Sequence, residues 1–226
     1  MKKIAIIAAM NSEYELLTRY FGKRVASDSY GMFAVDAYEK NGKTIYFVKS
    51  GVGEIHAAAA TQYVILKYSV DCVFNFGLAG GIAKDSEIGG TYLVKGVVHY
   101  DFDTGALDNT PVGKYSCFDS TVVDTDENLR KRVKEILPDI KEVVCASGDK
   151  FVADETFKNF LSGSFGASVC EMESAGILFI AKNAGVPCLI MKAVSDSGAS
   201  SREFVEFLNR SNDEYARLVS ELIAKL

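Results

Sequence analysis

The sequence predicts an α/β fold, in which a mostly parallel or mixed sheet is covered by helices on both faces. Apolar runs rich in β-branched residues alternate along the chain with segments of helical periodicity. Most of these runs are continuous rather than alternating, which is typical of strands buried on both faces. The 226 residues are enough for one large core and contain no linker-like stretch, so residues 1–226 are expected to form a single domain.

Each element is delimited by the start and end of its periodicity. Strands are expected at residues 2–10, 71–77, 89–103, 142–149 and 187–196, with a hairpin across 33–51. Asn41 and Gly42 are typical of the two-residue turn of such a hairpin. Helices are expected at residues 11–22, 52–69, 126–140, 154–161, 173–185 and 202–226. Gly185 followed by Pro187 marks one helix end. Residues 101–119 follow neither pattern and are expected to form a loop.

Composition argues against several classes of protein. Hydrophobic residues are 48% and charged residues 24% of the chain, which are the proportions of a compact soluble protein. The net charge of −5 argues against a nucleic-acid partner. The first apolar run is broken by Asn11 and Glu13, so it is too short for a signal peptide or a membrane span. We therefore expect a cytoplasmic protein with no membrane partner.

Cysteine and histidine usage argues against a metal or a cofactor. The five cysteines form no CxxC pair and are expected to be reduced core residues: Cys72, Cys117, Cys145, Cys170 and Cys188. The two histidines cannot supply an HExxH or Cys/His zinc pattern, and no GxSxG or GxxxxGK[ST] string occurs. The string GVGEIH of residues 51–56 nearly imitates a dinucleotide fingerprint. It lacks the third glycine and follows an antiparallel hairpin, which argues against a nicotinamide cofactor.

Four predicted strand ends carry polar or glycine-rich sequence, at residues 10–13, 77–81, 147–149 and 195–198. Open α/β sheets bind ligands outside the carboxyl ends of their strands. We therefore expect these four ends to converge on one pocket.

Glu13 stands in the first turn of the first expected helix. Ser12 and Glu15 fit an S-x-x-E capping box, which leaves Glu13 without a capping partner. The helix dipole favours an ionised carboxylate at this place by roughly 0.3–1 kcal/mol. Dipole complementation at the surface and a catalytic role are both open interpretations.

The stretch CEME of residues 170–173 places two acids around Met172. On a regular helix this spacing would point the side chains of Glu171 and Glu173 in different directions, so we expect the two acids to have different roles. Ser168 with Glu171 matches a capping box, which is the alternative to a binding role for Glu171. Glu173 precedes an apolar run and needs a polar ligand to satisfy its carboxylate.

Asp196 ends the last expected strand, directly after Ser195. A strand-terminal aspartate can cap the following helix. It can also be a carboxylic acid in a pocket, whose proton is retained by desolvation and is available for donation. The local sequence leaves both interpretations open.

Six stretches in this order resemble a known family: AAMNSEYELL, SGVGEIHAA, NFGLAGGI, SGDKFV, VCEMESAGI and KAVSDSG. They span nearly the whole chain and are similar to the 5′-methylthioadenosine/S-adenosylhomocysteine nucleosidases of the nucleoside phosphorylase superfamily. The resemblance implies a three-layer α/β/α sandwich around a mixed, mostly parallel central sheet, and usually a homodimer. It also implies hydrolysis of the bond between adenine and a 5′-thioribose, an activity of methionine salvage.

The resemblance further implies roles for single residues. Glu13 would activate water as a general base, Asp196 would protonate the leaving adenine, and Glu173 would hold the ribose hydroxyls. Phe151 would stack on the adenine, and the backbone of Phe151 and Val152 would read its edge. The residues expected to contact the substrate are Met10, Val52, Leu78, Phe151, Val152, Glu171, Met172, Glu173, Lys192, Ser195 and Phe204. Such a set is chemically sensible, because glycosidic cleavage passes through an oxocarbenium-like state that needs an acid and a base.

Two positions depart from the family's pattern. Leu78 stands where the family usually has a small hydroxyl residue, and Lys192 stands where it usually has an arginine. Leucine cannot hydrogen-bond through its side chain, and lysine replaces a planar fork with a point charge. Both positions are expected near the attacking water. Residues 101–119 are also unlike the usual segment, so the 5′ substituent is the least determined part of the substrate.

Three alternatives stay open. A purine nucleoside phosphorylase would need cationic donors for phosphate, and the stretch CVFNFGLAGG contains none. Another nucleoside hydrolase of the superfamily, such as a futalosine-type enzyme, fits the same acids. A non-catalytic nucleoside-binding protein fits the fold, but it would have no use for a base at Glu13.

Overall fold

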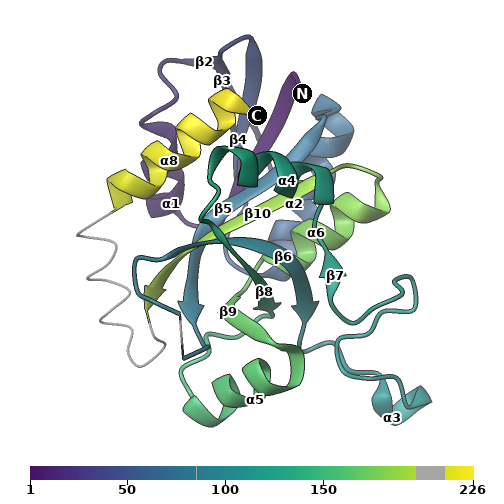
Figure 1. Ribbon diagram of the computed structural model, residues 1–226. Coiled ribbons are helices and arrows are strands. Elements are labelled where there is room, and N and C mark those ends of the chain that lie inside the picture. Colours follow the sequence, from purple (N-terminus) through teal and green to yellow (C-terminus); the bar gives the residue numbers. More distant parts are fainter. Residues whose placement is uncertain (85, 197–211) are drawn as a thin grey trace.

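The computed structural model describes residues 1–84, 86–196 and 212–226 (Figure 1). The strands are β1 (Lys3–Ala8), β2 (Arg24–Tyr30), β3 (Phe33–Lys40), β4 (Lys43–Lys49), β5 (Cys72–Gly81), β6 (Thr91–His99), β7 (Val123–Asp124), β8 (Lys141–Ser147), β9 (Ala167–Glu171) and β10 (Cys188–Asp196). The helices are α1 (Asn11–Thr18), α2 (Glu54–Tyr68), α3 (Gly105–Asp108), α4 (Glu127–Ile136), α5 (Glu155–Phe165), α6 (Ser174–Asn183) and α8 (Asn212–Lys225). Each expected strand and helix is found; the first part of the expected last helix, 202–211, lies outside the described residues.

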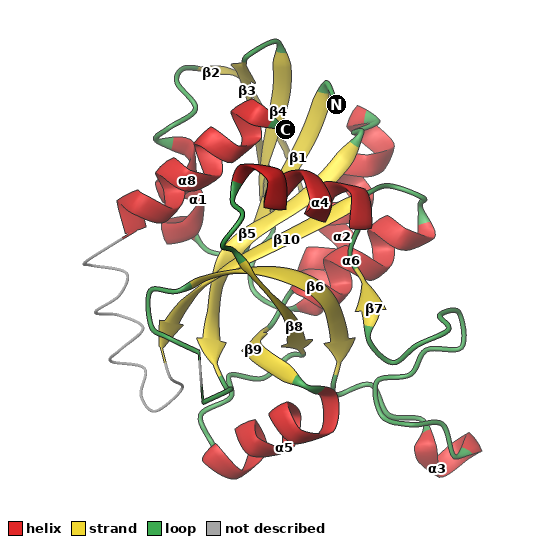
Figure 2. Ribbon diagram, in the orientation of Figure 1, coloured by secondary structure: helices red, strands yellow, loops and turns green. Residues whose placement is uncertain are grey.

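The strands join into one mixed sheet, as predicted (Figure 2). Their order is β10-β6-β8-β9-β5-β1-β4-β3-β2, and β7 pairs with β6. Because β5 also pairs with β10, the strands β5, β10, β6, β8 and β9 close into a ring, and β1 to β4 extend from it as an open sheet. Strand β1 runs parallel to β4 and β5, and β5 runs parallel to β10, so their carboxyl ends lie at one edge.

Strand β1 shows why helices cover both faces of the sheet. Ile4 and Ile6 belong to one buried cluster, together with apolar residues of α1, α4 and α8. Ala5 and Ile7 belong to a second cluster, together with α2 and α6. Successive side chains of a strand point to opposite faces, so β1 is the middle of three layers. In Figure 1, α4 and α8 lie in front of the sheet and α2 and α6 behind it, which confirms the expected sandwich.

The predicted hairpin is confirmed in its turn as well as its strands. Lys40 of β3 pairs with Lys43 of β4, and the two residues between them, Asn41 and Gly42, have φ of 50° and 72°. Two positive φ values in succession give the turn whose twist matches that of the strands.

Several short elements were not predicted from the sequence. Every residue of the edge strand β2 is exposed, so this strand has no buried face that an apolar pattern in the sequence could indicate. Strands β7 and β9 have two and five residues, and α3 is a single turn inside the expected loop. The glycine-rich residues 77–81 were expected to follow a strand, but β5 continues through them to Gly81.

The remaining expectations concern cysteines, metals and membranes. Four of the five cysteines are buried, but Cys117 of the 101–119 segment is exposed, so the expectation for this residue was wrong. Among the described residues, no group of three or more histidine, cysteine or acidic side chains is placed to hold a metal ion. No helix within the described ranges combines the length and the apolar character needed to cross a bilayer.

Candidate active site

A cavity of about 220 Å³ opens where the strand ends converge, as expected. Segments after β1, β4 and β8 reach it, together with the final residues of β5, β9 and β10. The expected substrate-contacting and catalytic residues that line it are Met10, Glu13, Val52, Leu78, Phe151, Glu171, Met172, Glu173, Ser195 and Asp196. Phe151 and Val52 are half exposed, and the acids are buried, so the polar groups lie deeper than the apolar ones.

Glu13 is fixed by three backbone N–H groups. Its Oε2 accepts from Ala9 N at 3.1 Å and Met10 N at 3.0 Å, and its Oε1 accepts from Leu78 N at 2.9 Å. The N-cap residue of α1 is Met10, two residues before the expected cap residue Ser12. Glu13, and not Glu15, is therefore the acid that accepts from the N–H of the cap residue. The carboxylate is buried with only 6% of the residue exposed. Such bonds hold the carboxylate in one place in the cavity.

Strand β5 approaches Glu13 so closely that a glycine is required. A Cβ atom on Gly77 would lie 2.8 Å from Glu13 Oε1, which is inside van der Waals contact. Gly77 has no positive φ, so it serves close approach and not a turn. The next residue, Leu78, donates its backbone N–H to Glu13, and this bond does not depend on a hydrogen-bonding side chain at position 78.

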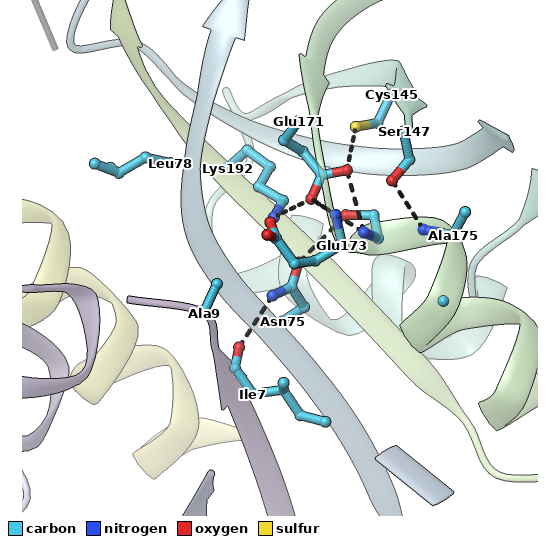
Figure 3. A network of polar contacts seen from close by, with 12 residues as sticks. Ile7, Ala9, Asn75, Leu78, Cys145, Ser147, Glu171, Glu173, Ala175 and Lys192 are labelled. Carbon is cyan, nitrogen blue, oxygen red and sulfur yellow. Dashed lines mark hydrogen bonds and ion pairs between the residues drawn. The ribbon is translucent and has the colours of Figure 1, made fainter. Parts of the chain in front are cut away.

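Glu171 and Glu173 do different jobs, as predicted, although neither lies within a helix. Glu171 ends β9 and caps helix α6, because its Oε1 and Oε2 accept from Ser174 N at 3.1 and 3.0 Å. The expected capping partner Ser168 is wrong, since it lies inside β9. Glu171 also accepts from Lys192 Nζ at 2.9 Å in a fully buried ion pair (Figure 3).

The ion pair determines the charge of Glu171. Burial acts to raise the pKa of its carboxyl, but the Lys192 ammonium and the hydrogen bonds outweigh burial and lower it. Lys192 keeps its proton for the reciprocal reason: burial is the largest effect and acts to lower the pKa of its ammonium, but the charge of Glu171, the neighbouring Cys145 and Glu173, and the hydrogen bond to Glu171 together raise it. Glu171 is therefore an anion whose charge is compensated inside the protein.

Glu173 is the N-cap residue of α6, but its side chain does not cap the helix. Because Glu171 already caps it, the Glu173 carboxyl is free to line the cavity, where Oε1 accepts from Gly53 N at 2.9 Å. Burial and then the negative charge of Glu171 raise the pKa of Glu173 to about 8. A polar ligand in the cavity would satisfy this buried acid, and the polar ligand expected for Glu173 from the sequence stays a prediction.

Asp196 lines the cavity from the end of β10 and is 2% exposed. Ser195 Oγ donates to its Oδ2 at 2.7 Å. Strand β5 lies beside it, since a Cβ on Gly80 would be 3.4 Å from Asp196 Oδ1. The Asp196 carboxyl thus lies between the end of its own strand β10 and strand β5, and the hydrogen bond from Ser195 fixes its position.

Within the described part of the chain, two predicted residues are not part of the lining. Val152 is buried against α5 in a separate apolar cluster, so it is Phe151 that reaches the cavity. Lys192 pairs with Glu171 and is not among the lining residues, and its expected place near the attacking water stays a prediction. Phe204 lies outside the described residues.

Two polar residues around the site, Asn75 and Glu54, were missed by the sequence analysis, whereas Ser147 and Asp149 belong to the strand end 147–149 that was expected there. Asn75 Nδ2 donates to Ile7 O at 3.0 Å, and its Oδ1 accepts from Ser174 Oγ at 3.3 Å, so it ties β1 to α6 (Figure 3). Asn75 lies inside an otherwise apolar strand, and a polar residue in such a run is a signal that could have found it. Nothing in the local sequence marks Glu54.

Comparison with known proteins agrees with this geometry. A model of the phosphorylase superfamily matches residues 3–224. The chain belongs to this superfamily. The Helicobacter pylori aminodeoxyfutalosine nucleosidase is 30% identical over 232 residues, covering all of both chains. A 5′-methylthioadenosine/S-adenosylhomocysteine nucleosidase of a Geobacillus species is 29% identical over 239 residues, covering 99% of each chain.

Solved structures of the superfamily give the same result. A crystal structure of Helicobacter pylori 5′-methylthioadenosine/S-adenosylhomocysteine nucleosidase matches with a TM-score of 0.94 at 30% identity, covering 100% of this chain and 99% of that chain. The Neisseria meningitidis nucleosidase in complex with methylthio-immucillin-A matches with a TM-score of 0.92 at 29% identity, covering 100% of each chain. The family resemblance noted from the sequence is thereby confirmed.

Proposed function

We propose that this superfamily member hydrolyses the N-glycosidic bond of 5′-methylthioadenosine and S-adenosylhomocysteine, and so releases adenine and the 5′-thioribose. The observation that carries the proposal is that Glu13, Glu173 and Asp196, which are far apart in the sequence, line one cavity. Glycosidic cleavage needs a base on water, an acid at the leaving group and negative charge near the sugar. Nucleosidase relatives that match along the whole chain support the same reaction class.

Glu13 is the proposed general base. It accepts the proton of a water molecule whose oxygen bonds to the anomeric carbon as the bond to adenine breaks. The three N–H groups that donate to its oxygens hold the carboxylate in place before the reaction. Glu173 is proposed to hydrogen-bond the ribose hydroxyls as both donor and acceptor, because its raised pKa of about 8 leaves it mostly protonated at pH 7.

Asp196 is the proposed general acid. It donates its proton to the imidazole-ring nitrogen of adenine, so that the base leaves neutral. Proton transfer by a positioned group typically gives about 10²–10⁴-fold in rate. Phe151 at the mouth of the cavity is proposed to stack on the adenine, and Met10, Val52 and Met172 supply the apolar walls that suit a thioether.

A phosphorylase is disfavoured by the charges in the cavity. No lysine or arginine is among its lining residues in the described part of the chain. The nearby cation Lys192 is already neutralised by Glu171 at 2.9 Å. Glu13 would repel phosphate from the place where a phosphorylase must attract it.

Incubation of the pure protein with 5′-methylthioadenosine in phosphate-free buffer tests the proposal. Adenine release followed by its absorbance or by chromatography is the expected result. Release that requires added phosphate would instead identify a phosphorylase. Tight binding without release would identify a nucleoside-binding protein.

A second candidate substrate is 6-amino-6-deoxyfutalosine, which shares the adenine leaving group. The observation that favours it is the 30% identity along the full length to an aminodeoxyfutalosine nucleosidase. A structure of Helicobacter pylori futalosine hydrolase also matches with a TM-score of 0.94. Measurement of kcat/KM for both nucleosides on one preparation decides which 5′ substituent is preferred.

We further propose that the protein is a cytoplasmic homodimer and that it acts in methionine salvage. Ile55 of α2 is 78% exposed and borders a second cavity of about 300 Å³, lined by Tyr115, Phe118 and Phe179. Apolar surface of this kind suits a protein partner, which supports a dimer. Light scattering on the purified protein should give twice the mass of one chain.

A further inference from the structure

Glu54 is a buried acid outside the catalytic set. It is the first residue of α2 and is only 6% exposed. Its carboxyl accepts hydrogen bonds from Ser147 Oγ and from Gly176 N, and its own N–H donates to Asp149 Oδ1 at 2.7 Å. One residue therefore joins the start of α2 to the end of β8 and to the start of α6.

The start of α6 is held by side chains from three different elements. The first N–H groups of a helix have no partner within the helix. Here Ser174 N donates to Glu171, Ala175 N donates to Ser147 Oγ at 3.0 Å, and Gly176 N donates to Glu54. Because Ser147 Oγ also donates to Glu54, two of these three contacts depend on the Glu54 carboxyl.

The residue before Glu54 contacts the active site directly. Gly53 N donates to Glu173 Oε1 at 2.9 Å, and Glu173 is the cap residue of the same helix α6. The two helix starts are packed tightly, since a Cβ on Gly176 would lie 2.6 Å from Glu54 O. A small shift of α2 against α6 would therefore separate Gly53 from Glu173.

We propose that Glu54 is a positioning residue, which locks the start of α2 against the start of α6 and so holds the Gly53 N–H on the Glu173 carboxyl. This inference rests on the proposed function only in naming the ribose hydroxyls as the ligand of Glu173. Glu54 does not touch the substrate cavity, and it acts through Gly53.

A glutamine should replace Glu54 with little loss. Burial, and next the negative charge of Glu171, raise the pKa of the Glu54 carboxyl to about 8, so the group is mostly neutral at pH 7. A glutamine is neutral and has the same shape. Its carbonyl oxygen can accept from Gly176 N while its amide donates to Ser147 Oγ.

The test compares Glu54→Ala, Glu54→Gln and the matched control Glu127→Ala, which alters the exposed first residue of α4. Hydrogen exchange of the Gly53 amide, followed by NMR without ligand, should be about tenfold faster in Glu54→Ala and unchanged in the other two. Calorimetry then uses a C-nucleoside analogue of adenosine and its 2′,3′-dideoxy form. Glu54→Ala should lose about tenfold in affinity for the first and keep its affinity for the second.

Each outcome is decisive. Wild-type protection of Gly53 in Glu54→Ala, or an equal loss of affinity for both analogues, would overturn the positioning role. If Glu54→Ala does not fold, Glu54→Asp gives the same readouts, because its shorter side chain cannot reach both Ser147 and Gly176. Failure of the wild type to release adenine would refute the proposed function, whereas the Gly53 exchange would still decide the role of Glu54.

Discussion

Glu13 has a structural and a proposed chemical role that a substitution can separate. Glu13→Gln keeps the size of the side chain and one acceptor oxygen, so it retains the backbone hydrogen bonds on that oxygen only, and it cannot take a proton from water. We expect turnover of 5′-methylthioadenosine to fall by on the order of 10² or more, with little change in ligand affinity. Initial rates and calorimetry on the same preparation measure the two effects.

Glu15→Gln is the matched control, because Glu15 lies on the exposed side of the same helix. This variant should turn over at the wild-type rate. Near-wild-type turnover of Glu13→Gln would show that Glu13 is not the general base. Its hydrogen bonds to Ala9, Met10 and Leu78 would then have a structural role alone.

Asp196 is tested by changing the leaving group. Asp196→Asn preserves the acceptor for Ser195 Oγ but has no acidic proton, so protonation of adenine is lost. Adenine nucleosides should lose about 10²-fold or more in kcat/KM. A substrate with a good leaving group, such as a nitrophenyl riboside, should lose much less, since its departure needs no proton. An equal loss on both substrates would count against proton donation.

At the scale of elements, the sequence analysis correctly predicted the turns and helix ends that depend on one or two adjacent residues. The Asn41-Gly42 turn and the Gly185 helix end were correct, because positive φ favours these residues at any place in a protein. The glycines of β5 were misread as a strand end, because their cause is long-range: Glu13 and Asp196 approach the strand from other elements. Strand β9 was missed because its five residues become a strand only by pairing with β8 and β5.

The close approach of β5 and α1 gives a prediction for Gly77→Ala. The added Cβ would meet Glu13 Oε1 at 2.8 Å, so the base must move. We expect a loss of about 1–3 kcal/mol in the free energy of unfolding and a marked fall in kcat. Gly163→Ala in α5 is the control, because nothing lies within 4 Å of its Cβ. It should stabilise α5 by about 0.5–1 kcal/mol, and a Gly77→Ala enzyme as active as this control would contradict the geometry.

The buried ion pair of Lys192 and Glu171 joins β10 to β9. Lys192→Met leaves Glu171 as an unpaired buried charge, so the free energy of unfolding should fall by about 3–5 kcal/mol. The double variant Glu171→Gln with Lys192→Met should recover much of this loss, since no buried charge is left. Urea denaturation of the wild type, both single variants and the double variant forms the cycle that measures the coupling. Additive losses would show that the pair is not coupled.

At the scale of the whole molecule, the sequence predicted the acids better than their surroundings. Glu13, Glu173 and Asp196 belong to short stretches that resemble one family, and the fold brings them to one cavity. The ion pair of Lys192 was not predicted, because its place in the chain does not reveal that Glu171 is its partner. Glu54 was missed for the same reason: its contacts come from β8 and α6, 93 and 122 residues away.

Burial of several acids around α6 predicts how stability depends on pH. The pKa of Glu54 and of Glu173 is raised to about 8, in both cases first by burial and then by the charge of Glu171; Asp149 adds to the effect on Glu54. In the unfolded chain both carboxyls ionise near their ordinary pKa of about 4.3. Their protonation therefore stabilises the fold fully below this value, and the contribution is lost as pH rises through about 8.

Glu54→Gln removes one of these two titrations and keeps the other. Between pH 5.5 and about 7.5 each raised carboxyl should lower the free energy of unfolding by up to about 1.4 kcal/mol per pH unit. The wild type should therefore lose stability more steeply than Glu54→Gln in this window. Glu127→Gln, at the exposed start of α4, should follow the wild type. Urea denaturation across the window measures the slopes, and parallel curves for wild type and Glu54→Gln would mean that Glu54 is already ionised in the folded protein.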